Sequence, residues 1–422
     1  MKRLNITQKD IKKKILEAKD EKKVFLESLN DPFTMFTLKV NQPFYPKNTH
    51  ETTFLIKLFN HLIHQVFKIE STVFKPSFSG DYYVYFTDIP PLILKKMTSY
   101  LEEHHPLGRL VDLDVYQSSK ALSRTKPRTC YLCEADAHYC ARSQNHKPYE
   151  IKTYITQQIQ TFIINALTAE ATNALRKEVY LTPKFGLVSA KDSGAHLDMD
   201  LNLFLTSINA ITPFFKMFTK TAFEKTFEML RIIGIQAEEA MFQATNQVNT
   251  HKGAIFIFGS ILPALAHAIY YQKPLDNMLE FMHDYLHPLI KDDFKALNYK
   301  EGLTAGEIMY ERYGTKGIRG EVLNKFPSIF SWYHNHYDSH YEKLCAIMAH
   351  LEDTTIIKRF NFQTLKTVQN DMRDLLKEKP FNLSYYHSLS SKYKALGISP
   401  GGSADLLGLT FLFEASLHLL PQ

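Results

Sequence analysis

Hydrophobic and polar positions follow two different patterns along this chain, and the pattern changes near residue 150. Before that point, segments with apolar residues at helical spacing are mixed with short segments rich in β-branched and aromatic residues. This mixture predicts an α+β domain. We expect helices at 8–29, 55–67 and 92–103, and strands at 33–40, 81–86 and 107–115.

After about residue 149, apolar residues recur at helical spacing through long segments, and convincing strands are absent from the pattern. An all-α second domain is therefore expected. No Gly/Ser-rich or Pro-rich linker separates the halves, so the boundary near 147–156 is predicted to be a packed junction or a short turn. The predicted domains are 1–150 and 155–422, with helices at 155–179, 204–220, 223–242, 255–271, 276–290, 341–351, 362–378 and 404–420.

Composition fits a globular protein of two or three domains, with 422 residues, 45% hydrophobic and 22% charged. A net charge of +6 suits anionic, phosphorylated small molecules but lacks the dense basic stripe of a dedicated nucleic-acid binder. With four cysteines and a basic N-terminus that has no apolar segment, we expect a cytoplasmic protein. Residues 253–272 carry no acidic or basic side chain, yet Gly259, Pro263 and His267 favour a buried core helix or helix pair over a membrane span.

Two aspartates in the segment Leu110-Val111-Asp112-Leu113-Asp114-Val115 are the first candidate site. Strand periodicity places Asp112 and Asp114 on one face and the apolar residues on the other. Two adjacent carboxylates make a hard oxygen site suited to Mg²⁺, which would bridge to phosphate oxygens. Gly108 and Arg109 would let a phosphate approach and help to neutralise it. Two solvated aspartates on an edge strand are the alternative, and the motif alone does not decide between them.

Three of the four cysteines lie close together downstream of these aspartates. Cys130, Cys133, Cys140 and His146 have a spacing that matches a Cys₃His zinc site, although buried reduced cysteines are an equally ordinary explanation. The same segment contributes cations at Arg124, Arg128 and Arg142.

The motifs GRLVDLDV and LSRTKPRTCYLCEADAHYCARS, with His146 after them, resemble the apo-citrate lyase phosphoribosyl-dephospho-CoA transferases over about residues 5–150. The resemblance implies a nucleotidyltransferase-like domain. In the implied reaction, a serine hydroxyl of the citrate lyase acyl carrier protein, the γ subunit, attacks an activated dephospho-CoA derivative and pyrophosphate leaves. Asp112 and Asp114 stand where that chemistry needs its metal.

Three turns rich in Gly, His, Lys, Asn and Asp mark the second half, at 182–199, 248–253 and 399–407. In the first, Asp192 or Ser193 is expected to cap a helix beginning near residue 195, which would place His196 and Asp200 on one face. In the second, Asn249 or Thr250 is expected to cap a helix whose free N–H groups bind an anion. The third is a glycine turn with an acid in the first helical turn. Each could be an ordinary capped turn. A fourth candidate region comprises 304–307, 313–314 and 317–321.

These four blocks resemble the triphosphoribosyl-dephospho-CoA synthases over about residues 157–422. The resemblance implies that the ribose of ATP is joined to a ribose hydroxyl of dephospho-CoA, with adenine as the leaving group. Such a displacement passes through an oxocarbenium-like transition state and needs carboxylates, an acid and a base. Mg²⁺ and cationic side chains would hold the triphosphate. The candidates are Asp198, Glu307, Glu321 and Asp405 as carboxylates, His196 and His251 for proton transfer, and Lys184, Asn249, Lys252, Arg319, Gly401, Gly402 and Ser403 for binding.

The chain departs from the synthase pattern at three positions. Phe185 and Ser189 stand where that family usually has Pro and Asp, and Gln247 stands where it usually has Gly. Ser189 cannot replace a carboxylate, so either that acid is dispensable or Asp192 takes its place.

The two resemblances join, because the product implied for the second half is the substrate implied for the first. We therefore expect a bifunctional enzyme that matures citrate lyase. The equivalent enzyme for the malonate decarboxylase carrier is an alternative. A zinc-knuckle nucleic-acid-binding module is another, disfavoured because 130–146 has few arginines and two tyrosines.

Overall fold

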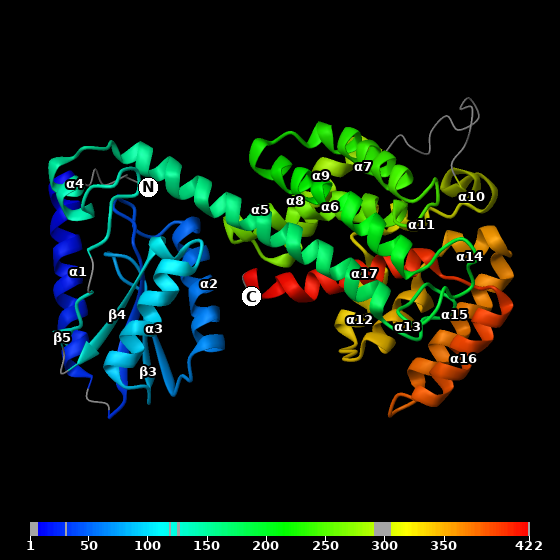
Figure 1. The fold of residues 1–422 in the computed structure, drawn as a ribbon, viewed down its shortest axis with the longest axis horizontal. Coiled ribbons are helices and arrows are strands. Elements are labelled where there is room, and N and C mark those ends of the chain that lie inside the picture. The colour runs from blue at the N-terminus through cyan, green and yellow to red at the C-terminus, as the bar shows by residue number, and fades with distance from the viewer. Residues whose placement is uncertain (1–6, 30–31, 118–119, 125–126, 291–304, 421–422) are drawn as a thin grey trace, which may run out of the picture. The chain divides into compact units, whose positions relative to one another are not determined.

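The computed structural model describes residues 7–29, 32–117, 120–124, 127–290 and 305–420 (Figure 1). The chain forms two compact units. The first, here called the sheet unit, comprises Met1–Ile163 with Ile269–Gln272, and the second, the helical unit, comprises Ile164–Ala268 with Lys273–Gln422. Along the sequence, the first change of unit falls inside one long helix, α5 (Pro148–Tyr180), which begins within the predicted boundary region.

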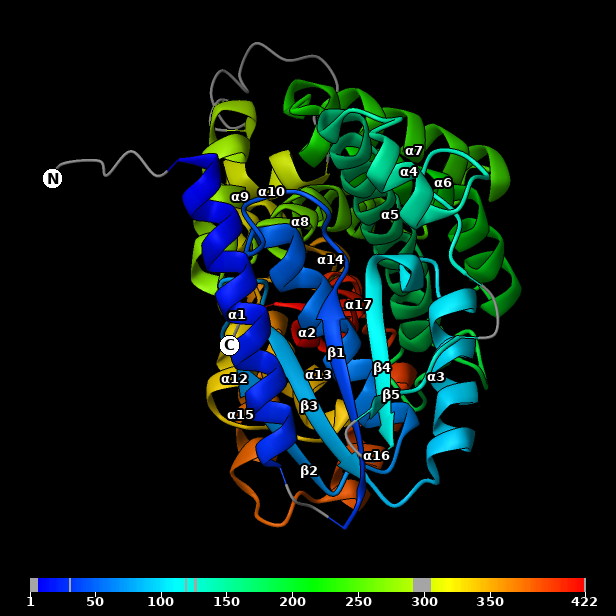
Figure 2. The ribbon, with the colours of Figure 1, turned by 90° about the vertical axis from the view of Figure 1, so that its left-hand side faces the viewer.

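Among its described residues the sheet unit contains one antiparallel sheet of five strands in the order β2-β3-β1-β4-β5 (Figure 2). The helices α1 (Gln8–Ser28), α2 (His50–Val66), α3 (Pro91–His104) and α4 (Ala137–Ser143) accompany it. The predicted mixture of helices and strands is thus present. The strands are β1 (Thr34–Val40), β2 (Ser71–Lys75), β3 (Tyr82–Thr87), β4 (Val111–Gln117) and β5 (Lys120–Ala121).

Helices α1 and α2 contact opposite faces of this sheet. On the α1 face, Leu26 packs in a cluster with alternate residues of β3 that include Tyr82 and Val84. On the other face, Tyr85 of β3 donates a hydrogen bond from its hydroxyl to Asn60 Oδ1 of α2, at 2.8 Å. Because side chains alternate along a strand, every second residue of each strand lies on the α1 face, and residues paired across neighbouring strands share a face.

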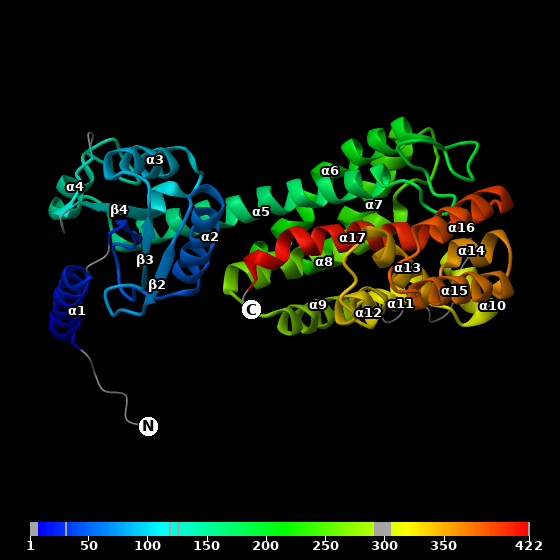
Figure 3. The same cartoon turned by 90° about the horizontal axis from the view of Figure 1, so that it is seen from below.

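The described part of the helical unit contains α-helices and short 3₁₀ turns and no strand, as expected (Figure 3). Its core includes α8, whose residues are almost all buried. Helices α5 and α8 lie alongside α17, since a Cβ on Gly408 would be 3.1 Å from Leu175 and 3.7 Å from Phe258. The bounds are α6 (Leu201–Glu224), α7 (Leu230–Ala244), α8 (Lys252–Tyr271), α9 (Leu275–Ile290), α10 (Ala305–Tyr313), α11 (Gly317–Leu323), α12 (Pro327–His334), α13 (His340–His350), α14 (Thr354–Arg359), α15 (Phe362–Lys377), α16 (Leu383–Leu396) and α17 (Gly401–Ser416).

Three predicted elements are wrong in detail. The strand expected at 107–115 begins at Val111, after a 3₁₀ turn at Gly108–Leu110. The helix expected at 223–242 is interrupted, because Lys225 ends α6 in a left-handed conformation (φ 56°) before α7 starts at Leu230. No helix begins near residue 195: α6 starts at Leu201, where the side chain of Asp200 accepts a hydrogen bond from the Leu203 N–H. Strands β2 and β5, and helices α4, α10–α12, α14 and α16, were not predicted from the pattern.

In the described part of the chain, α8 alone is long and apolar enough to cross a membrane by length and composition. Of its most apolar window, 83% is buried inside the protein. It is one helix, with Pro263 inside it, rather than a pair. The prediction of a buried core helix is confirmed.

Candidate active sites

In the sheet unit, Asp112 and Asp114 lie on one face of β4, as the strand period predicted. They stand opposite Lys39 and Thr37 of β1, whereas Leu113 stands opposite Leu38 on the buried face. Because Lys39 in turn faces Tyr82 of β3, this face is the one that α1 contacts. The two carboxylates are partly exposed.

Lysines from α1 and β1 surround the two aspartates. Burial lowers the pKa of the Lys22 ammonium on α1, and the neighbouring carboxylates of Asp114 and Asp112 oppose that fall. Burial also lowers the pKa of Lys39 to about 8, and the ammonium groups of Lys22, Lys47 and Lys19 add to the fall. Lys39 donates to Ser79 Oγ at 3.1 Å. This face of the sheet therefore combines two carboxylates with a group of partly buried cations, a mixture that suits a metal-bound phosphate.

A buried carboxylate holds two of the predicted arginines beside Asp112. Glu102 of α3 is 1% exposed and accepts a hydrogen bond from the Leu113 N–H at 2.8 Å. Arg124 pairs with Glu102, and Arg128 bridges Glu102 Oε1 and Asp112 Oδ1, each at 2.6 Å. Burial raises the pKa of Asp112, an effect that Arg128 opposes. Arg128 therefore orients Asp112 as well as neutralising it.

The other predicted residues of this unit have structural contacts. Gly108 lies where an added Cβ would be 2.5 Å from the carbonyl oxygen of Glu102, so the 3₁₀ turn requires glycine there. Arg109 donates to the carbonyl of Thr129 and lies 5.4 Å from the ring centre of Tyr131. Arg142 is exposed on α4.

The predicted zinc ligands come together in space. One ligand atom from each of Cys130, Cys133, Cys140 and His146 lies within 4.8 Å of all the others. His146 Nε2 is 3.3 Å from Cys133 Sγ. The described residues of the chain contain no other group of three or more His, Cys, Asp or Glu side chains close enough to hold a metal ion.

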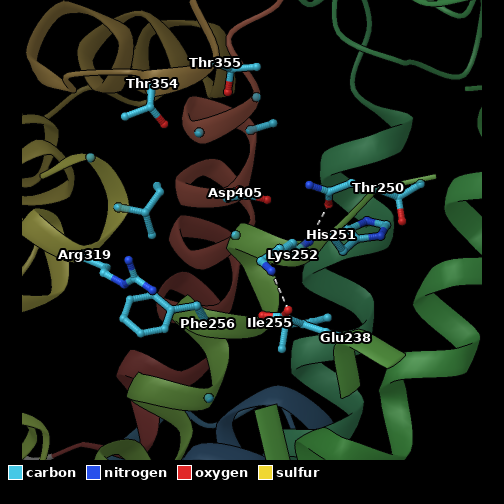
Figure 4. Close-up of a pocket in the computed structure, with 18 of the residues that line it drawn as sticks. Glu238, Thr250, His251, Lys252, Ile255, Phe256, Arg319, Thr354, Thr355 and Asp405 are labelled. Carbon is cyan, nitrogen blue, oxygen red and sulfur yellow. Dashed lines mark hydrogen bonds and ion pairs between the residues drawn. The ribbon is translucent and has the colours of Figure 1, made fainter. Parts of the chain in front are cut away.

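In the helical unit, a pocket of about 860 Å³ collects most of the predicted turns (Figure 4). Most of its apolar lining comes from α6 to α9 and includes Phe218, Leu230, Ile235 and Phe256. Its polar lining comes largely from segments that precede helices or begin them. The cationic side chains that line it are Arg231, Lys252, Lys316, Arg319, Lys358 and Arg359.

The first turns of α8 and α17 both reach this pocket. His251 is the residue whose carbonyl accepts the first helical hydrogen bond of α8, from Ile255, while Asn249 Oδ1 accepts from the Lys252 N–H at 3.2 Å. The side chain of Asn249 thus accepts a hydrogen bond from the first turn of α8, although Asn249 lies two residues before the N-cap, His251. The side chain of Lys252 pairs with Glu238 Oε2 of α7 at 2.6 Å, as Figure 4 shows. Gly401 and Gly402 form the start of α17 on the same pocket.

Asp405 is the predicted carboxylate that lines the pocket, where it is half-buried. Burial raises its pKa well above the ordinary value, and the nearby carboxylates of Glu178 and Asp353 raise it further. Gly253 allows this arrangement, because a Cβ there would lie 2.0 Å from Asp405 Oδ2. Asp405 therefore favours its protonated form, in which a carboxylic acid can donate a proton.

Glu178, at the end of α5, is a pocket residue that the sequence did not single out. It is 4% exposed and pairs with Lys184 Nζ at 2.6 Å. Burial raises the pKa of the Glu178 carboxyl, and the Lys184 ammonium opposes that rise. Lys184, expected to hold the triphosphate, is itself 2% exposed and also donates to the Glu178 carbonyl at 2.7 Å. In this structure Lys184 supports Glu178 from behind the pocket wall.

Both predicted histidines line the pocket, but their ring nitrogens differ in their hydrogen bonds. Burial lowers the pKa of His251 to about 3, and Lys184 adds to the fall, so the ring is neutral at pH 7. Its Nδ1 lies 2.7 Å from Ser207 Oγ, and its buried Nε2 has no hydrogen-bond partner among the described residues. His196 has both ring nitrogens engaged: Arg359 donates to Nδ1 at 3.0 Å, and Nε2 lies 2.8 Å from Ser399 Oγ.

Besides Lys184, four predicted residues are not part of the pocket lining. Asp198 is exposed in the loop before α6. Glu321 is buried, where it accepts hydrogen bonds from the Ser328 N–H and hydroxyl at 3.1 and 2.6 Å. Glu307 is also buried, and Ser403 donates to Asp353, which caps α14. Thr304, in the fourth candidate region, lies outside the described residues.

The positions that depart from the synthase pattern have local structural roles. Ser189 is 3% exposed, and its hydroxyl accepts from the N–H groups of Lys191 and Asp192 at 3.3 and 3.4 Å. Asp192 accepts from the Gly194 N–H and pairs with Lys394 at 3.0 Å. Neither residue lines the pocket. Gln247 adopts a left-handed conformation (φ 67°), which explains why glycine suits this position.

The pocket residues missed by the sequence lie outside the glycine-rich turns. Glu178 and Glu238 are acids on long helices, and Arg359 ends α14. In the sheet unit, the sequence could have indicated Lys39. Thr37 and Lys39 are alternate polar residues in β1, just as Asp112 and Asp114 are in β4, and the two pairs lie on the same face of the sheet.

Comparison with known proteins divides the chain into two family regions, and their boundary coincides with the first boundary between the structural units, at residue 163. Residues 11–162 match the family model of apo-citrate lyase phosphoribosyl-dephospho-CoA transferase. Residues 164–420 match the model of ATP:dephospho-CoA triphosphoribosyl transferase.

Relatives that match both parts of this chain in one polypeptide occur in bacteria. Protein CitXG of Leuconostoc mesenteroides subsp. cremoris is 30% identical, and the alignment covers 98% of this chain and 97% of the relative. Protein CitXG of Haemophilus influenzae is 33% identical over 81% of each chain. The 2-(5''-triphosphoribosyl)-3'-dephosphocoenzyme-A synthase of Haemophilus ducreyi is 34% identical, over 68% of this chain and all of the relative. The chain therefore belongs to the family of fused citrate lyase prosthetic-group transferases, with a phosphoribosyl-dephospho-CoA transferase part followed by a triphosphoribosyl transferase part.

Proposed function

We propose that the helical unit joins the ribose of ATP to a ribose hydroxyl of dephospho-CoA and releases adenine. We further propose that the sheet unit then attaches the product to a serine of the citrate lyase acyl carrier protein and releases pyrophosphate. We assign these steps to residues 155–422 and 1–150. The observation that carries the proposal is the helical pocket, where six cationic side chains line the same cavity as Asp405, a half-buried carboxyl with a raised pKa.

The cationic groups and the helix starts would bind the triphosphate of ATP. Helices α8 and α17 both begin at the pocket, where the positive end of each helix dipole favours an anion, and Arg319 and Lys252 are part of the same pocket lining. Charge-assisted hydrogen bonds from several cations are what a polyanion with four negative charges requires. Lys184 is not part of this set; its role is to support Glu178.

Asp405 is our candidate for the general acid. The departing adenine leaves with the electron pair of the bond to the ribose carbon, so protonation of its ring speeds its departure. A carboxyl whose pKa is raised well above its ordinary value keeps its proton to a higher pH, so Asp405 can supply that proton. Glu178, paired with Lys184, is our candidate for the carboxylate that stabilises the oxocarbenium-like ribose and accepts the proton of the attacking hydroxyl.

The histidines would orient groups rather than transfer protons as cations. A pKa of about 3 makes His251 a poor base. Thr250 donates to Ser207 Oγ at 2.7 Å, so Ser207 is free to donate onward to Nδ1 of His251. The ring hydrogen is then on Nε2, which can donate a hydrogen bond to bound substrate.

The apolar lining would receive the pantetheine arm of dephospho-CoA. Helices α6 to α9 supply most of it, and Gly234 of α7 has no atom within 4 Å of an added Cβ. Open space beside a glycine that lines the pocket fits a long, chain-like ligand group.

The sheet unit fits a bound Mg²⁺ by its donor set. Asp112 and Asp114 supply two carboxylates, and substrate phosphates would complete the oxygen ligands. When bound there, the ion would neutralise charge on the reacting phosphate and the leaving pyrophosphate. Lys22 and Lys39 would hold the phosphates, Arg128 would orient Asp112, and the serine of the carrier would attack. A nucleotidyltransferase-like arrangement is part of this proposal.

Fusion of the two units serves this reaction order, because the product of the helical unit is the substrate of the sheet unit. Because both sites belong to one chain, the intermediate released by one unit is at a raised effective concentration for the other.

The test is to incubate the full chain with ATP, dephospho-CoA, Mg²⁺ and the apo carrier protein, and to measure adenine and the carrier mass. We expect adenine release in the absence of the carrier, and a mass gain on the carrier when all components are present. The malonate decarboxylase carrier, offered as a competing acceptor, should remain unmodified. If the folded protein releases no adenine and the carrier mass does not change, the proposal is wrong.

A further inference from the structure

The segment from residue 127 to residue 147 lacks a hydrophobic core of its own. Among its residues, all of which the structure describes, Cys140 alone is buried. Cys133 is exposed and Cys130 is half-buried. Burial in a hydrophobic core therefore does not explain why three cysteines and a histidine meet here. In contrast, Cys345 of α13 is fully buried in the helical unit, as an ordinary core cysteine is.

The backbone of this segment is arranged around the four side chains. A bridge between Thr129 and Asp136 closes the turn that carries Cys130 and Cys133, and the Cys130 N–H donates to the Ala135 carbonyl at 2.7 Å. The Leu132 N–H donates to Cys130 Sγ at 3.5 Å, a contact that stabilises a thiolate.

The other two side chains arrive from the helix that follows this turn. Cys140 lies on α4, whose first turn is capped by Asp136. His146 follows a left-handed residue, Gln144, that ends α4 and turns the chain back.

We propose that Cys130, Cys133, Cys140 and His146 bind one Zn²⁺ ion as a closed, structural Cys₃His site. Three thiolates and an imidazole are the ligand set that zinc prefers, and tetrahedral bonds of about 2.0 to 2.3 Å bring such ligand atoms to roughly 3.3 to 3.9 Å of one another. The four atoms lie within 4.8 Å of one another, close enough for small side-chain movements to bring them to that separation. Four protein ligands leave no position for substrate, so the ion orders the segment rather than taking part in chemistry.

The zinc site would also fix the arginine that orients Asp112. Arg128, two residues before Cys130, bridges Asp112 and Glu102. Tyr131, inside the metal turn, donates to the carbonyls of Asn41 and Arg109 at 3.0 and 3.2 Å, which ties the turn to the sheet. This second part rests on the proposed function, because it makes Arg128 a positioning residue for carrier modification.

The first experiment measures metal content and does not depend on activity. The full chain is expressed with zinc, purified without chelator and assayed by inductively coupled plasma mass spectrometry. We expect about one zinc ion per chain. Growth with cobalt should give the thiolate-to-metal charge-transfer absorption of a tetrahedral Co²⁺ site.

Matched cysteine variants locate the ion. Cys133→Ser changes an exposed side chain and should leave a folded protein that has lost its zinc, whereas Cys345→Ser, a core cysteine, should retain it. Wild-type protein that is folded but holds less than about a tenth of an ion per chain would overturn the proposal. So would a Cys133→Ser variant with undiminished zinc.

A second experiment separates the two parts of the inference. Chelation of the wild-type protein should abolish carrier modification and leave adenine release unchanged, and added Zn²⁺ should restore the lost step. Unchanged carrier modification in the zinc-free protein would overturn the positioning role while the metal site stands. Absence of both activities from zinc-loaded wild-type protein would count against the proposed function instead, since the zinc content is measured independently.

Discussion

Asp112 and Asp114 lie two positions apart on one strand, whereas the groups that line the helical pocket come from segments between residues 175 and 405. In the sheet unit, the alternation of side chains along β4 places both aspartates on one face, and cationic side chains from neighbouring elements surround them. In the helical unit, a carboxyl on α17 meets a glycine on α8 and the end of α5, so the site exists only when distant helices pack. A site on one strand depends on fewer long-range contacts than a site formed where the ends of several helices come together. The following variants test this contrast.

The largest effect is expected from Asp112→Asn in the sheet unit. Loss of one of two metal-binding carboxylates should lower the rate of carrier modification by about 10³-fold. Adenine release should be unchanged, because the helical pocket contains no residue of this strand. Both products are measured in the same incubation by chromatography and by carrier mass. Asp20→Asn, an exposed change on α1, is the matched control and should affect neither step. Loss of both steps in the Asp112 variant would contradict the division of labour.

Asp405→Asn should act on the other step alone. Removal of the general acid is expected to lower adenine release by about 10²-fold or more, because general acid catalysis contributes about 10²- to 10⁴-fold. Asp198→Asn, in an exposed loop, serves as the control and should retain the wild-type rate. Carrier modification supplied with the preformed intermediate should survive in both variants. Equal losses in the two variants would refute the choice of Asp405 among the predicted acids.

Gly234→Leu probes the apolar side of the helical pocket. The new side chain enters open space, so we expect the KM for dephospho-CoA to rise about tenfold while the KM for ATP stays constant. Folding should not suffer, since replacing a helical glycine gains about 0.5 to 1 kcal/mol. Gly234→Ala, measured by the same kinetics and by thermal unfolding, should be more stable and nearly unchanged in KM. An increase in the KM for ATP instead would reverse the assignment of the two ends of the pocket.

The smallest effect expected is a pH dependence confined to carrier modification. Lys39 has a pKa of about 8, so its positive charge is present below that pH and is lost as the pH rises through it. The kcat/KM for carrier modification should therefore fall above pH 8, by about fivefold between pH 8 and pH 9 if the charge is required. Lys39→Arg keeps its charge and should remove the fall. A decline of the same shape in the Arg variant would assign it to another group.

Much of the sheet unit could be predicted from the sequence, because strand and helix periods are local properties. The period of 2 in β4 placed Asp112 and Asp114 on one face, and the structure agrees. The start of β4 was placed too early, because Gly108 packs against α3 in a 3₁₀ turn that only tertiary contact specifies. Glu102 was missed because a single glutamate on an amphipathic helix carries no signal until two arginines are found beside it.

In the helical unit, the sequence by itself determined the long helices, the turns between many of them and the residue types those turns offer. It left the four predicted acids unranked. Tertiary packing distinguishes them. Asp405 lines the cavity, whereas Glu321 accepts hydrogen bonds from Ser328 outside it. Glu307 is buried but does not line the cavity, and Asp198 is exposed. The physical reason is that a carboxyl acquires its role from burial and neighbouring charge, and these come from segments that only the folded chain brings together.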